Sequence, residues 1–192
     1  MQRAPCAARK HRLANVMLSI FDNGPQAPYP RLFNMAAHVL AQSRVCPDKI
    51  ALQILHTDHS DAWTYRELEA AVLGIAAGLL ESGAQPGDLI LMRLGNTVDY
   101  PLTYLGALAA GLVPVPTSAA LTLPEVERII EELSPTLIVR DTAVTCPETS
   151  NQIHLPQLQA MCDLSPVGYH MGEPERLGYV VYTSGTSGKP RA

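Results

Sequence analysis

Residues 88–115 read D-L-I-L-M-R-L-G-N-T-V-D-Y-P-L-T-Y-L-G-A-L-A-A-G-L-V-P-V, and the strongest indication of the fold lies in this stretch. Its first part, 88–94, is an apolar run of strand length. Residues 100–110 are small and apolar all round, which is typical of a buried helix. Residues 113–115 form a second short apolar run. A strand, a helix and a strand in this order predict parallel strands joined by a helix.

The same alternation extends on both sides of this stretch. Upstream, the spacing predicts a helix over 32–45, a strand over 50–55 and a polar loop over 56–61. Two capping boxes, Thr64 with Glu67 and Thr122 with Glu125, open further helices, and Gly83 ends the first of them. Strands are predicted over 136–140 and 177–182, and the segment 141–175 between them is poorly patterned. The whole pattern predicts a layered α/β fold with a mostly parallel sheet flanked by helices.

Composition and charge exclude several classes of protein. The 192 residues are 47% hydrophobic and 17% charged, so a disordered chain is excluded. The net charge of −4 argues against broad electrostatic capture of nucleic acid or of an anionic membrane. An apolar run long enough to span a bilayer is missing from the sequence. The four cysteines lack a C-x-x-C spacing, which favours reduced thiols in a cytoplasmic protein.

The first 30 residues are predicted to be an N-terminal extension with a proline-rich lead. Residues 1–12 are basic and 13–21 are mostly apolar, which imitates a targeting peptide. A small-residue cleavage site does not follow, since the next residues are D-N-G-P. We therefore favour Met17 as the initiator over a cleaved leader.

The closing segment carries the chemistry. Residues 182–191 read Y-T-S-G-T-S-G-K-P-R and follow an apolar run. Glycines let backbone N–H groups turn toward an anion, hydroxyls add donors, and Lys189 and Arg191 add positive charge. The segment is not a Walker A loop, because Thr183 lies where that motif needs glycine and Pro190 follows the lysine. A plain Ser/Gly loop is the alternative, but the adjacent apolar run and the K-P-R sequence favour a polyphosphate-binding loop.

This loop closely resembles the signature loop of the adenylate-forming (AMP-binding) enzymes, which include acyl-CoA synthetases, luciferases and nonribosomal peptide adenylation domains. The family pattern is an apolar strand followed by [ST]-[SG]-G-[ST]-[TS]-G-x-P-[KR]. Here Arg191 and Ala192 replace the commoner lysine and glycine. T-Y-R-E-L at 64–68 and Y-L-G-A-L-A-A-G-L-V-P-V-P at 104–116 resemble two earlier family elements, so the resemblance runs from Thr64 to the end of the sequence.

The resemblance implies ATP-dependent activation of a carboxylic acid through an acyl-adenylate, followed by thioester formation, with Mg²⁺ and with CoA as acceptor. Residues 31–192 are then an incomplete AMP-binding N-terminal domain, and the catalytic residues are expected beyond residue 192. We therefore expect the 192-residue chain alone to be inactive. No metal ligand is assigned within it. The resemblance implies that the phosphates would be held by Thr183, Ser184, Gly185, Thr186, Ser187, Gly188, Lys189 and Arg191.

Two alternatives stay open for the function. One is an adenylation domain that loads a carrier protein instead of CoA. The other is an inactive, truncated phosphate-binding remnant, whose incomplete sheet would expose apolar edges and aggregate. The sequence does not identify the acid, the acceptor or the oligomeric state.

Three further residue groups have weaker interpretations. His56, His59 and neighbouring aspartates could bind a metal, but a solvated polar loop is the favoured interpretation. Ser187, His170 and Asp163 could be arranged as a hydrolase triad, but the G-x-S-x-G elbow is missing. Trp63 is expected to pack at the end of a strand.

Overall fold

The computed structural model describes residues 24, 28, 30–184, 190 and 191. The predicted N-terminal extension, 1–30, lies almost entirely outside the described residues, as does Met17. None of the described helices combines the length and apolar character that a bilayer-spanning segment needs.

A four-stranded parallel sheet forms the centre of the fold. Its strands are β3 (Leu89–Arg93), β4 (Val113–Pro116), β5 (Leu137–Arg140) and β6 (Gln152–His154), in the order β4-β3-β5-β6. The chain passes from β3 to β4 on one side and then returns to β5 on the other side of β3. The loops that follow β3 and β5 therefore diverge at the carboxyl edge of the sheet, which is where α/β folds bind their ligands.

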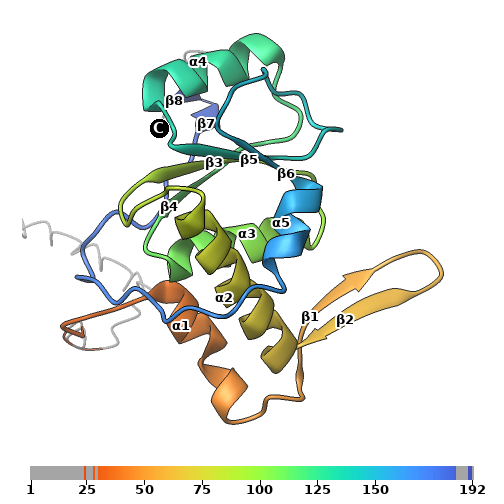
Figure 1. Ribbon diagram of the computed structural model, residues 1–192, viewed down its shortest axis with the longest axis vertical. Coiled ribbons are helices and arrows are strands. Elements are labelled where there is room, and N and C mark those ends of the chain that lie inside the picture. Colours follow the sequence, from red (N-terminus) through yellow and green to blue (C-terminus); the bar gives the residue numbers. More distant parts are fainter. Residues whose placement is uncertain (1–23, 25–27, 29, 185–189, 192) are drawn as a thin grey trace, which may run out of the picture.

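Helices cover both faces of this sheet (Figure 1). On one face lie α2 (Tyr65–Glu81), α3 (Asp99–Ala109) and α5 (Leu155–Met161), and on the other lies α4 (Leu123–Leu133). Each face has its own core: Ile90, Met92 and Val139 point to the larger helical layer, whereas Leu91 and Ile138 pack with Val126 and Ile129 of α4. The alternation along each strand separates the two cores. The predicted layered α/β fold is confirmed.

The capping boxes place the two amphipathic helices as predicted. Thr64 and Glu67 make reciprocal hydrogen bonds at the start of α2, and Thr122 and Glu125 do the same at the start of α4. These bonds satisfy backbone donors that a helix start would otherwise leave unpaired.

The predicted helix over 32–45 is shorter and irregular. It consists of α1 (Met35–Val39) followed by the 3₁₀ turn η1 (Leu40–Arg44). Asn34 is buried, and its side-chain amide donates to the carbonyl oxygens of Leu108, Ala109 and His170. Its Oδ1 accepts from the Ala37 N–H. These long-range contacts fix Asn34 as the N-cap, so the helix cannot begin earlier.

The predicted polar loop over 56–61 is partly wrong. Strand β1 (Ile50–Leu55) pairs antiparallel with β2 (Ser60–Thr64), so Ser60 and Asp61 belong to a strand. The hairpin projects from the body of the molecule (Figure 1), and most of β2 is exposed. Only the last two residues of β2 are partly buried, so its sequence lacks the apolar alternation of a half-buried strand and resembles a loop. Trp63 does pack against the core at the end of β2, as predicted.

The predicted strand over 177–182 is also wrong, although its side chains alternate. Val180 and Tyr182 pack against the α4-side core, while Leu177, Tyr179 and Val181 are exposed. The Val180 N–H donates to the Pro114 carbonyl of β4 at 3.1 Å. The Val113 N–H donates to the Asp88 carbonyl, directly before β3. Pro114 and Pro116 therefore occupy the positions of β4 that face away from β3, and proline has no N–H to donate to residues 177–182. A ladder therefore does not form.

The poorly patterned segment contains two short elements that the sequence did not predict, β6 and α5. With 3 and 7 residues, both are too short for periodicity to identify them.

Candidate functional site

A cavity of about 470 Å³ lies at the carboxyl edge of the sheet. It is lined by residues 94–96 after β3, Pro116 at the end of β4 and the three residues that follow it, Tyr100 of α3, and Val181 and Tyr182. The last two residues directly precede the predicted phosphate loop. The start of the predicted loop therefore adjoins the cavity, whose other lining residues lie more than 60 residues earlier in the sequence.

The two ends of the phosphate loop pair with each other. Strand β7 (Thr183–Ser184) is antiparallel to β8 (Pro190–Arg191), with Thr183 opposite Arg191 and Ser184 opposite Pro190. Figure 1 shows this pair on the α4 side of the sheet, where Tyr182 also packs. The structure thus brings together the backbones of three predicted site residues, Thr183, Ser184 and Arg191. The other five, Gly185, Thr186, Ser187, Gly188 and Lys189, lie outside the described residues.

Tyr182 anchors the start of this loop. Burial raises the pKa of its phenol to about 12, and the Glu132 carboxylate of α4 adds to the shift, so the hydroxyl is neutral at pH 7. Its hydroxyl oxygen is buried and has no hydrogen-bond partner among the described residues. Tyr182 is therefore held by the packing of its aromatic ring against the core.

Arg93 supports two loops at the carboxyl edge of the sheet. The sequence analysis did not identify this residue. Its side chain is fully buried at the end of β3. Nε and Nη2 donate to the Thr145 carbonyl, and Nη1 donates to Thr117 Oγ1 and to the Ser118 carbonyl at 2.6 Å. Thr117 in turn donates to the Met92 carbonyl. One guanidinium thus fixes two loops at the carboxyl edge, one of which lines the cavity.

Burial lowers the pKa of Arg93, and the nearby Cys146 thiol opposes this shift. An arginine remains charged at pH 7 even so. The only sequence signal for this role is a single charge inside the apolar run D-L-I-L-M-R-L.

The side chains considered for a hydrolase triad are not brought together. The imidazole of His170 packs against Gly111, whereas Asp163 follows α5. Among the described residues, no hydrogen bond or ion pair joins His170 to Asp163, and Ser187 lies outside them.

Known proteins resemble this chain over most of its length. A model of the family described as AMP-binding enzyme matches residues 39–192. Enterobactin synthase component F of Escherichia coli (strain K12) is 27% identical over 172 residues, covering 88% of this chain and 13% of that protein. Gramicidin S synthase 2 of Brevibacillus brevis is 26% identical over 173 residues, covering 88% of this chain and 4% of that protein. The chain thus spans a small part of the length of the curated relatives it matches.

Solved structures share the fold. The N-terminal subdomain of Klebsiella oxytoca NpsA superposes with a TM-score of 0.72 at 20% identity, covering 84% of this chain and 41% of that chain. A benzoate CoA ligase from Burkholderia xenovorans LB400 gives a TM-score of 0.67 at 22% identity, covering 79% and 33%. The fold and the family match agree, and this chain belongs to the family of AMP-binding, adenylate-forming enzymes.

Proposed function

We propose that this chain is the N-terminal, phosphate-binding part of an enzyme that activates a carboxylic acid with ATP. In the first step a carboxylate oxygen attacks the α-phosphorus of ATP, which gives an acyl-adenylate and releases pyrophosphate. In the second step a thiol sulfur attacks the acyl carbon, which gives a thioester and releases AMP. The observation that carries this proposal is the β7–β8 pairing, which brings together the two ends of the predicted phosphate loop directly after Val181 and Tyr182 of the cavity lining.

The loop would act on the phosphates by hydrogen bonding and charge. The hydroxyls of Thr183, Ser184, Thr186 and Ser187 would donate to phosphate oxygens, and Gly185 and Gly188 would allow close backbone approach. Lys189 and Arg191 would offset the charge that develops as pyrophosphate leaves. This is electrostatic stabilisation of a leaving group and needs no proton transfer.

The residues that line the cavity fit Mg²⁺ only if the phosphates of the nucleotide supply most of its ligands. Its lining offers the Asn96 amide and the hydroxyls of Thr117 and Ser118, but none of its residues is a carboxylate. Mg²⁺ in such enzymes is commonly held by substrate phosphates with few protein ligands. When bound with ATP, it would neutralise phosphate charge, and this chain would hold it indirectly through the loop.

We propose CoA as the acyl acceptor, with fatty or other small acids as substrates. The fold shared with the benzoate CoA ligase supports this proposal. A cytoplasmic location belongs to the same proposal, and Cys46, Cys146 and Cys162 are free thiols in the structure.

A carrier protein is the second candidate acceptor. Its support is that several of the curated relatives are synthases, and that one structural neighbour is described as an artificially fused adenylation–PCP di-domain. Both candidates share the first step and differ only in the thiol.

One experiment separates the two steps. Exchange of labelled pyrophosphate into ATP by the full-length protein, across a panel of carboxylic acids, would reveal adenylation. Thioester formation with CoA, compared with a phosphopantetheinylated carrier protein, would then identify the acceptor. The absence of exchange with every acid would contradict the proposal.

The 192-residue chain alone is expected to give no acid-dependent pyrophosphate exchange. The chain supplies the phosphate loop, and the groups that carry the chemistry are expected beyond residue 192. The matched sample is the full-length protein at equal concentration. Exchange by the 192-residue chain would show that the catalytic groups lie within it.

A further inference from the structure

The β1–β2 hairpin brings two histidines and an aspartate onto one face. Its register pairs Ile54 with Asp61 and Leu55 with Ser60, and the His56 N–H donates to the His59 carbonyl at 2.9 Å. His56 and His59 are therefore opposite each other across the turn. Because side chains alternate along a strand, His56, His59 and Asp61 lie on the same side of the hairpin.

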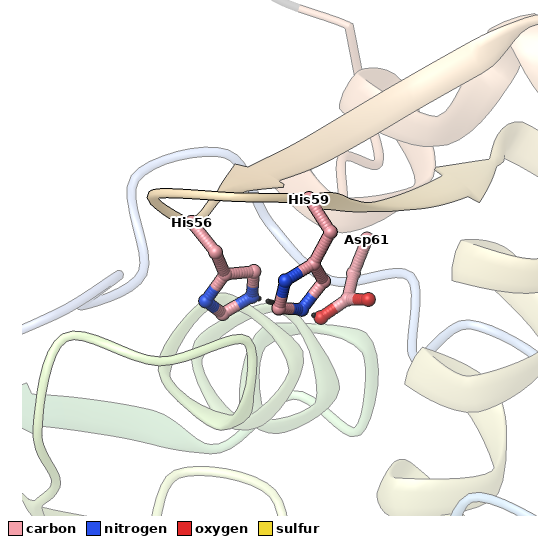
Figure 2. Close-up of side chains that lie close together, drawn as sticks. All are labelled: His56, His59 and Asp61. Atoms are coloured by element: carbon pink, nitrogen blue, oxygen red, sulfur yellow. Dashed lines mark hydrogen bonds and ion pairs between the residues drawn. The ribbon is translucent and has the colours of Figure 1, made fainter.

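The donor atoms of these three side chains lie close together (Figure 2). One donor atom from each residue lies within 4.8 Å of the others. His56 Nε2 is 3.0 Å from Asp61 Oδ2, and the two imidazole rings stack with centroids 4.2 Å apart. Ligands of a tetrahedral Zn²⁺ ion, at about 2.0–2.2 Å from the metal, are roughly 3.3 Å from one another. The His56–Asp61 pair already has nearly this spacing.

The stacked rings must rotate relative to each other before both can bind one ion. A metal lies in the plane of each imidazole that binds it, and two parallel rings do not share a plane. The side chains of His56 and His59 are 39% and 58% exposed, so this rotation displaces little of the core.

Asp58 prepares His59 as a ligand. Its Oδ1 lies 2.8 Å from His59 Nδ1 and accepts the proton of that nitrogen, which leaves Nε2 with its lone pair for a metal. Ligating histidines commonly donate their second ring N–H to a carboxylate in this way. Asp58 and Asp61 also provide two negative charges for a dication.

There is room for further ligands beside the cluster. A second cavity of about 490 Å³ is lined by His56 and Asp61 together with Trp63 of β2 and residues 96–98 after β3. Water molecules there could complete the coordination of an ion that has three protein ligands.

We propose that His56, His59 and Asp61 bind one divalent first-row transition metal ion of the Zn²⁺ type, with Asp58 as the hydrogen-bond partner that orients His59. Two imidazoles and one carboxylate favour Zn²⁺, Co²⁺ or Ni²⁺ over Mg²⁺ and Ca²⁺, which prefer oxygen ligands. These residues are not among those of the proposed phosphate loop.

Titration of the 192-residue chain with Zn²⁺ in an isothermal calorimeter, in buffer that keeps the thiols reduced, tests the proposal. We expect one ion per chain and at least about a tenfold loss of affinity in the His56→Ala/His59→Ala variant. Asp58→Asn should weaken binding about tenfold, as second-layer partners of metal ligands do. His38→Ala, at an exposed histidine outside the cluster, should bind like the parent chain.

Co²⁺ supplies a second readout, because its visible absorption depends on the ligands. The parent chain should show the bands of a bound ion, and the double variant should not. Circular dichroism would verify that the double variant is folded, as expected for two exposed side chains. Lack of Zn²⁺ binding at millimolar concentration, or unchanged affinity in the double variant, would overturn the proposal.

Discussion

Arg93 holds the carboxyl edge of the sheet through hydrogen bonds alone. Its partners are two backbone carbonyls and one hydroxyl, all in loops that follow other strands. Arg93→Met keeps a similar volume and removes every donor, so the buried Thr117 hydroxyl oxygen and two partly buried carbonyl oxygens lose a hydrogen-bond partner. We expect the free energy of unfolding to fall by about 3 kcal/mol, because each unpaired buried acceptor costs about 1–3 kcal/mol and release of the buried charge offsets part of the sum.

Urea denaturation of the two proteins measures this loss. Arg128→Met is the matched control, since Arg128 is exposed on α4, and it should change the free energy of unfolding by less than about 0.5 kcal/mol. If Arg93→Met were as stable as Arg128→Met, Arg93 would not be what fixes these loops.

At the scale of single residues, the sequence was most informative where a residue acts locally. The caps Thr64 and Thr122 could be predicted because their partners are three residues away. Asn34 and Arg93 could not, because the Asn34 amide donates to carbonyls 74 to 136 residues away and Arg93 to oxygens 24 to 52 residues away, which only the fold brings close.

The start of α2 gives this element a dependence on pH. The backbone N–H and the hydroxyl of Thr64 donate to the Glu67 carboxylate, and these two hydrogen bonds lower the pKa of Glu67. The unfolded chain therefore binds the proton more readily than the folded one. The stabilisation is present above the unfolded pKa of Glu67 and is lost as the pH falls through the folded value.

Glu67→Gln should flatten the acid side of the plot of stability against pH. Thermal unfolding between pH 6 and about pH 3 would show the parent losing stability more steeply than the variant. Glu127→Gln, at an exposed position of α4, is the matched control and should keep the parent's slope. Identical slopes in all three proteins would mean that the carboxylate of this cap does not contribute.

The segment 177–182 shows how an apolar run of strand length can still fail to form a strand. Its apolar character predicts a strand, and in the structure alternate side chains, Val180 and Tyr182, pack against the core. The sequence analysis did not identify the strand beside this segment, which is β4. Pro114 and Pro116 of β4 lack the N–H groups that a ladder needs, and a pairing partner is a property of the fold.

At the scale of the whole molecule, the architecture was more predictable than the projecting parts. The order of strands and helices from 65 to 140 predicted the layers, because apolar runs of strand length alternate there with segments typical of helices. The sequence around His56 and His59 predicts a loop, because the register that brings these side chains to one face arises only from the pairing of β1 with β2. Of the phosphate loop, the backbone pairing of its two ends is described, and the roles of 183–191 remain predictions.

The exposed apolar side chains of residues 177–182 predict how the 192-residue chain behaves in solution. Leu177, Tyr179 and Val181 are 60%, 48% and 46% exposed, next to the edge strand β4. Exposed apolar side chains along a sheet edge favour association. We expect the chain to form concentration-dependent oligomers, and Leu177→Asp/Val181→Asp to shift it toward monomer. The free energy of unfolding should change by less than about 0.5 kcal/mol, because these side chains are not in the core.

Light scattering coupled to size-exclusion chromatography would measure this shift. Leu55→Asp is the matched control, because Leu55 is 78% exposed but lies on the β1–β2 hairpin, away from this edge. The control should associate like the parent if the edge is responsible. A monomeric parent at high concentration would show that this edge does not drive association, and an equal effect of the control would implicate exposed leucines in general.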